Sequence, residues 1–152
     1  MESEQIITKI YGAYNLLISK ERHLFEIDVN ERSLTHKFAE YLQIGFPDWN
    51  VDCEYNRIGI DKKILEKFKQ KIDSDNAEGV TVYPDIIIHN RGTKENLVVI
   101  EAKKTSSTAK DIDEDKLKAF KEELGYKFAY KVIFPVKEKF EAIKVSECII
   151  EK

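Results

Sequence analysis

The residues that can carry out chemistry are concentrated in positions 83–104, which read YPDIIIHNRGTKENLVVIEAKK. This stretch contains two apolar runs typical of β-strands, separated by a polar turn around Gly92. Asp85 lies at the start of the first run, and Glu101 and Lys103 lie at the end of the second. Two carboxylates and an ammonium group are the side chains that metal-assisted hydrolysis requires.

A hairpin register can bring these three side chains together. Residues two apart on a strand point to the same face, so Glu101 and Lys103 share a face. If the turn pairs Asn90 with Asn96, Asp85 lies opposite Glu101, with Cβ atoms about 4.5–5.5 Å apart. Carboxylates this close repel each other unless a positive charge lies between them. A hard cation such as Mg²⁺ suits this site, and Lys103 could activate a water bound to the metal or stabilise charge on a phosphate.

A further acid comes from a predicted helix over residues 31–43, for which Asn30 is a good N-cap. The helix carries one apolar stripe, formed by Leu34, Phe38, Tyr41 and Leu42. Glu31 falls inside this stripe, whereas Glu40 lies roughly opposite. An acid in the first turn also interacts favourably with the helix dipole. Both a metal-ligating and a structural role therefore stay open for Glu31.

The remaining pattern predicts an α/β fold, with a small mixed β-sheet flanked by helices. The expected elements, in order, are a helix at 4–19, the helix at 31–43, a strand at 49–57, a short lysine-rich helix at 61–72, strands at 80–89 and 97–103, a helix at 113–124 and a strand at 126–134. Mixed charge indicates a solvated, capped helix at 113–124, closed by Gly125. The tail from residue 136 onward has no clear pattern.

Composition limits the class of protein. The chain has 152 residues, of which 42% are hydrophobic and 35% charged, as expected of one ordered domain spanning 1–152. No apolar run is long enough for a membrane span, and Cys53 and Cys148 form neither a disulfide framework nor a zinc motif. We therefore expect a soluble cytoplasmic protein. The net charge of −3 disfavours a protein that coats nucleic acid without specificity.

The motif halves Pro84-Asp85 and Glu101-Ala102-Lys103, fifteen residues apart, resemble those of the PD-(D/E)xK nuclease superfamily. The resemblance implies an αβββαβ, restriction-endonuclease-like core over about residues 30–135, preceded by an extra N-terminal helix. It also implies that the helix carrying Glu31 is the leading helix of that core. The lysine-rich insert at 61–72 departs from the family pattern.

This resemblance implies a Mg²⁺-dependent nuclease that hydrolyses phosphodiester bonds, with DNA as the expected substrate and a water activated by the metal as the nucleophile. Asp85, Glu101, Lys103 and Glu31 would be the catalytic residues, and the three acids would bind Mg²⁺ or Mn²⁺. No membrane partner is expected, and a homodimer stays open.

Basic side chains suggest where nucleic acid could bind. Arg57, Lys62, Lys63 and Lys67 could follow a phosphate backbone, although a run of charges on a helix is more commonly a solvated face. Two other functions also fit the sequence. The chain could be a catalytically inactive nuclease-fold module that binds nucleic acid or a protein partner. Alternatively, it could be a scaffold whose acids and lysines form ordinary cross-strand ion pairs.

Overall fold

The computed structural model describes residues 1–54, 83–108, 112–136 and 143–150. The helices in these ranges are α1 (Ser3–Lys20), α2 (Arg22–Glu26), α3 (Glu31–Gly45) and α5 (Asp113–Leu124). The strands are β1 (Asn50–Cys53), β2 (Ile86–His89), β3 (Asn96–Lys104), β4 (Phe128–Phe134) and β5 (Lys144–Glu147). No helix in these ranges is both long and apolar enough to cross a lipid bilayer.

The strands form one sheet in the order β1-β2-β3-β4-β5. Strands β3 and β4 pair in parallel, and the other neighbouring pairs are antiparallel. A parallel pair requires a crossover connection, which α5 provides between β3 and β4. The predicted mixed α/β fold, with helices flanking a small mixed sheet, is confirmed.

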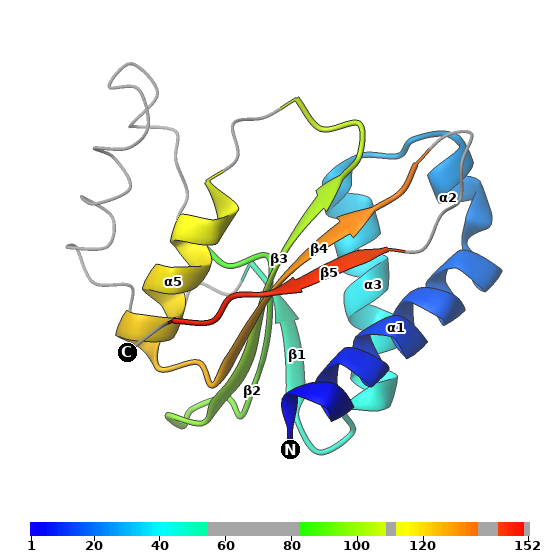
Figure 1. Cartoon of the computed structure of the whole chain (residues 1–152). Coiled ribbons are helices and arrows are strands. Elements are labelled where there is room, and N and C mark those ends of the chain that lie inside the picture. Colours follow the sequence, from blue (N-terminus) through cyan, green and yellow to red (C-terminus); the bar gives the residue numbers. More distant parts are fainter. Residues whose placement is uncertain (55–82, 109–111, 137–142, 151–152) are drawn as a thin grey trace.

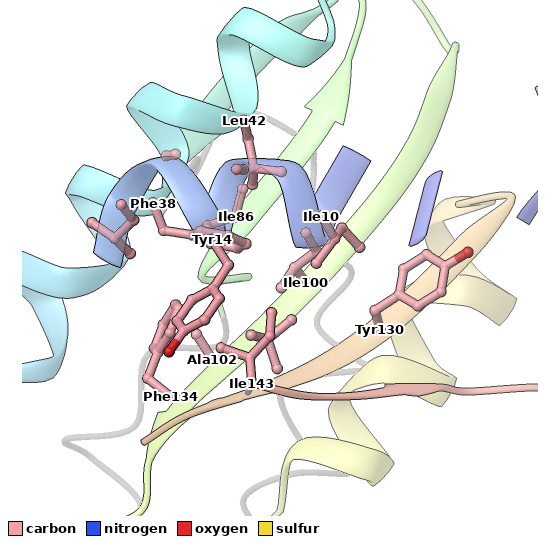
Figure 2. Packing of buried hydrophobic residues seen from close by; sticks show 14 of the residues in the cluster. Ile10, Tyr14, Phe38, Leu42, Ile86, Ile100, Ala102, Tyr130, Phe134 and Ile143 are labelled. Carbon is pink, nitrogen blue, oxygen red and sulfur yellow. The ribbon is translucent and has the colours of Figure 1, made fainter. Parts of the chain in front are cut away.

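Helices cover both faces of the sheet, with α1 and α3 on one side and α5 on the other (Figure 1). Side chains alternate between the two faces along each strand. Even-numbered residues of β3, such as Ile100 and Ala102, join the larger apolar cluster with Tyr14 and Phe38 (Figure 2). Val99 joins the smaller cluster under α5. The odd-numbered face of β3 is therefore the face that α5 covers.

Local signals define the helix ends that position the site. The Asn30 side chain accepts a hydrogen bond from the backbone N–H of Ser33 at 2.8 Å, which caps the start of α3. Gly125 adopts φ +70° directly after α5, a conformation that glycine reaches without steric cost. The predicted N-terminal helix and the helix boundaries at 31 and 113–124 are confirmed.

The hairpin register agrees with the prediction over most of β2. Ile86 pairs with Ile100 and Ile88 with Val98, as expected, but His89 pairs with Asn96 because of a β-bulge near the turn. The expected pairing of Asn90 with Asn96 is therefore wrong. The bulge absorbs the extra residue of β3, so the predicted register holds farther from the turn.

Within the described residues, which exclude 55–82, the observed strands are shorter than those predicted at 49–57 and 80–89. The first ends at Cys53, since Glu54 adopts φ +46° and leaves the strand direction. The second begins only at Ile86, after Pro84, which has no N–H to donate to a sheet. Helix α2 and strand β5 were not predicted. The predicted helix at 61–72 lies outside the described residues.

Candidate active site

Asp85 lies at the junction of three strands. Its Oδ2 accepts a hydrogen bond from the backbone N–H of Ala102 at 2.8 Å, in the middle of the Glu-Ala-Lys segment of β3. Its backbone carbonyl accepts a second hydrogen bond from the N–H of Glu54, just after β1, at 3.1 Å. Asp85, which directly precedes β2, is thus hydrogen-bonded to β3 on one side and to the residue that follows β1 on the other.

Glu101 is the most buried of the predicted site residues, with a relative exposure of 1%. Its carboxyl group interacts electrostatically with that of Asp85, whose Oδ2 accepts a hydrogen bond from the next residue of β3, Ala102. When both groups are ionised neither can donate a hydrogen bond. Among the described residues, no donor reaches Glu101 Oε1. A buried acceptor in this state requires a shared proton or a cation.

Burial raises the pKa of Glu101 well above its ordinary value, and the neighbouring Asp85 charge raises it further. The ammonium group of Lys116, from α5, opposes this shift, because its Nζ lies 3.2 Å from Glu101 Oε2. The site is therefore a close carboxylate pair with one lysine on its α5 side.

Lys103 points to the same face as Glu101 but contacts a different acid. Its Nζ lies 3.7 Å from Asp113 Oδ2, in the first turn of α5, and both side chains are largely buried. The expectation that residues 113–124 form a solvated helix is therefore wrong for the face carrying Asp113 and Lys116. Helical spacing could have revealed them, because both share a face with the buried residues Leu117 and Phe120.

Glu31 begins α3 and lies at the edge of this cluster. Burial is the largest effect that raises the pKa of Glu31, and the nearby Asp85 charge raises it further. A hydrogen bond from the backbone N–H of Lys104 lowers the pKa. Charge interactions with Asp113 and Lys103 also reach this carboxyl group. The structure thus brings Glu31 into the electrostatic field of the predicted site.

A cavity of about 780 Å³ opens beside Glu31 and Asp85. Its wall includes Thr35, Cys53 and Glu54, together with Arg32 from the exposed side of α3. Burial raises the pKa of the Cys53 thiol to about 11, so the thiol is neutral near neutral pH and is a poor nucleophile. The acids on this wall are Glu31, Glu54 and Asp85, and His36 also lines it.

The carboxylates of Asp85 and Glu101 meet some of the requirements of a site for a hard cation. Two adjoining carboxylates with an unpartnered buried oxygen suit Mg²⁺, which commonly takes one or two protein carboxylates and fills its other positions with water. Across the described ranges, however, no group of three or more His, Cys, Asp and Glu side chains could hold a metal ion. Asp85 and Glu101 would hold the ion, and Glu31 would act through a water.

Lys104, adjacent in sequence, has a structural role. Its Nζ donates to the backbone carbonyl of Val29 at 2.9 Å and lies 3.0 Å from Asp28 Oδ1. This lysine ties the end of β3 to the segment that precedes α3. The predicted nucleic-acid contacts Arg57, Lys62, Lys63 and Lys67 lie outside the described residues.

Comparison of the chain with family models, with curated proteins and with solved structures gives no match.

Proposed function

We propose that this chain is a Mg²⁺-dependent nuclease that hydrolyses phosphodiester bonds of DNA. The observation that carries this proposal is the buried Glu101 carboxyl group, with one oxygen lacking a hydrogen-bond donor in the described protein, next to the point where Asp85 binds the backbone of β3. Natural proteins keep such repelling acids chiefly where function needs them. The proposed metal is Mg²⁺, or Mn²⁺ in its place.

The order of the elements supports the proposal. In the described chain, α3, β1, β2, β3, α5 and β4 follow one another as in the αβββαβ core of the PD-(D/E)xK superfamily. On this view α1 and α2 are additions before the core, and β5 is an addition after it. The Pro-Asp half of the motif precedes β2, and the Glu-Ala-Lys half lies on β3.

Each side chain would have a distinct part in the reaction. A bound Mg²⁺ would supply a more acidic water and neutralise charge on the phosphate. Asp85 and Glu101 would hold the ion, while Glu31 would orient water at its edge. Lys103, held by Asp113, would stabilise the negative charge that develops as water attacks phosphorus. The new bond joins the water oxygen to phosphorus, the bridging P–O bond breaks, and the leaving oxygen takes up a proton.

The cavity beside Glu31 and Asp85 supports a substrate larger than a single phosphate. At about 780 Å³ it lies in the size range typical of small-molecule sites. Arg32 on its wall is 82% exposed and pairs only loosely with Glu54, at 3.4 Å. An exposed pair of this kind contributes little stability, so Arg32 can turn to a substrate phosphate.

The proposal is tested by a cleavage assay on duplex, single-stranded and branched DNA and on RNA, with Mg²⁺, with Mn²⁺ and with a chelator. We expect metal-dependent cleavage of DNA that is lost in Glu101→Gln. The thermal midpoint of the wild type should also rise with Mg²⁺, because a ligand that binds the folded state stabilises it. No cleavage and no shift in midpoint with either metal would refute the proposal.

A second candidate is a catalytically inactive module of the same fold that binds nucleic acid or a protein partner. The two ion pairs Lys116–Glu101 and Lys103–Asp113 favour it, because they partly neutralise the acids without a metal. Such a module would bind DNA in the same assay, by a shift in mobility, without cutting it at any metal concentration.

A further inference from the structure

An ammonium group from α5 pairs with the buried acid of the Glu-Ala-Lys segment. Lys116 Nζ lies 3.2 Å from Glu101 Oε2, whereas Lys103 Nζ lies 3.7 Å from Asp113. Only 13% of the Lys116 side chain and 1% of the Glu101 side chain are exposed, so water screens this pair poorly. Lys116 thus supplies a positive charge that stabilises the ionised form of Glu101.

We propose that Lys116 is an internal counterion of the Asp85–Glu101 pair, and that Mg²⁺ displaces it from Glu101 on binding. The inference rests on the proposed function, because it takes this pair as the metal site. A dication and an ammonium group on one buried carboxylate would repel each other strongly at low dielectric. The long flexible stem of Lys116 allows the ammonium group to withdraw while α5 stays in place.

Competition between the two cations has a measurable consequence. The binding free energy of Mg²⁺ must include the loss of the Lys116–Glu101 ion pair. Lys116→Met removes the ammonium group and keeps an apolar stem that can pack against α5's neighbours. We expect it to bind Mg²⁺ about tenfold more tightly than the wild type, a change of about 1.4 kcal/mol.

The experiment is titration calorimetry with Mg²⁺ alone on the full chain. Lys116→Arg keeps the charge, and Lys118→Met removes an exposed charge from the same helix, so both should bind Mg²⁺ as the wild type does. Lys103→Met removes an equal charge from the site, at the lysine that pairs with Asp113. We expect it to change the affinity less than about threefold, which separates displacement from general electrostatics.

The outcomes distinguish the two proposals. If wild type and Lys116→Met bind Mg²⁺ equally, or the variant binds more weakly, the counterion inference is overturned and the metal site stands. If neither binds Mg²⁺, the carboxylate pair is no metal site, and the proposed function and this inference both fail. Binding by Lys116→Met alone would support the inference and show that Lys116 blocks the site.

A measurement on the wild type covers the case in which Lys116→Met does not fold. The side-chain ammonium resonance of Lys116 can be followed by NMR as Mg²⁺ is added. We expect it to shift along the same saturation curve as the calorimetric binding, while that of Lys118 stays constant. Saturable Mg²⁺ binding with an unmoved Lys116 resonance would overturn the inference.

Discussion

The Asp85 carboxylate accepts a hydrogen bond from the backbone N–H of Ala102 at 2.8 Å, next to the buried residue Glu101, whose pKa the Asp85 charge raises. The hydrogen bond holds Asp85 in place, and the charge of Glu101 opposes that placement. The two effects depend on different properties of one side chain, its acceptor oxygen and its charge. Substitutions can therefore separate them.

Asp85→Asn keeps an oxygen that can accept from Ala102 but removes the charge beside Glu101. Without divalent cations we expect its free energy of unfolding to exceed that of the wild type by about 1 kcal/mol, because a repulsion is relieved. Stabilisation by Mg²⁺ and cleavage should both be lost. Urea denaturation with and without Mg²⁺ measures the first two quantities.

Asp85→Ala is the matched control, because it removes the acceptor as well as the charge and should be less stable than Asp85→Asn. If Asp85→Asn is clearly less stable than a wild type that does not respond to Mg²⁺, the acids are structural and the nuclease proposal must be dropped.

The raised pKa of Glu101 predicts a pH-dependent stability in metal-free protein. Glu101 binds its proton more tightly in the folded than in the unfolded state, so folding takes up a proton. This contribution is fully present below the ordinary pKa of 4.5 and is lost as the pH rises through the raised folded-state pKa. Stability should therefore fall with rising pH over that window.

Urea denaturation of the wild type and Glu101→Gln across this window measures the effect of Glu101 together with the groups coupled to it, because titrating groups that do not interact with Glu101 cancel in the difference. The difference between the two proteins should slope with pH above 4.5 and flatten above the folded-state pKa. A flat difference curve would show that Glu101 has an unshifted pKa.

Glu31→Gln tests whether the first residue of α3 contributes to metal binding. We expect Mg²⁺ affinity to fall about tenfold, the size typical of groups that act on a metal through a neighbouring ligand or water. The free energy of unfolding should change by less than about 1 kcal/mol, the range of a helix-dipole interaction. Calorimetry and thermal denaturation measure the two effects.

Glu40→Gln is its matched control on the exposed side of the same helix, where Glu40 pairs with His36 at 2.9 Å and with Lys37 at 3.4 Å. It should bind Mg²⁺ as the wild type does. If Glu31→Gln and Glu40→Gln change the Mg²⁺ affinity equally, Glu31 interacts with the helix dipole and does not contribute to the metal site.

Lys103→Met should reduce the cleavage rate about 100-fold or more, the loss typical of a group that stabilises transition-state charge. It should also lower the free energy of unfolding by about 1–3 kcal/mol, since Asp113 loses a charged neighbour in a buried place. Single-turnover cleavage and urea denaturation provide the two measurements. The exposed residue Lys94 provides a control, Lys94→Met, which should leave both unchanged.

The parts of the fold that short-range chemistry specifies could be predicted. Asn30 and Gly125 mark helix ends through their own conformational preferences, and both ends lie where expected. Alternation and turn placement were enough to bring Asp85 level with Glu101, although the bulge at His89 changes the turn itself. Without the bulge, the one-residue difference in pairing at the turn would have moved the acids to opposite faces.

The parts that depend on long-range packing were predicted less well. Charge in α5 indicated solvent exposure, but the sheet covers the face carrying Asp113 and Lys116. The charge pattern alone does not show this burial, whereas the helical spacing of both residues with Leu117 and Phe120 does indicate it. Strand β5 is short and half-exposed, so its hydrophobic alternation is too weak to distinguish it from a tail.

The hydroxyl groups of Ser3 and Tyr130 share a hydrogen bond of 2.8 Å across 127 positions of sequence. Helix α1 therefore completes its packing only after β4 has been synthesised. Until then α1 can pack against α3, but the apolar surface of the helices that meets β4 in the finished fold stays exposed. Contacts of such large sequence separation slow folding, and exposed apolar surface in the interim favours aggregation. Production of the protein should therefore benefit from slow translation, low temperature or co-expressed chaperones.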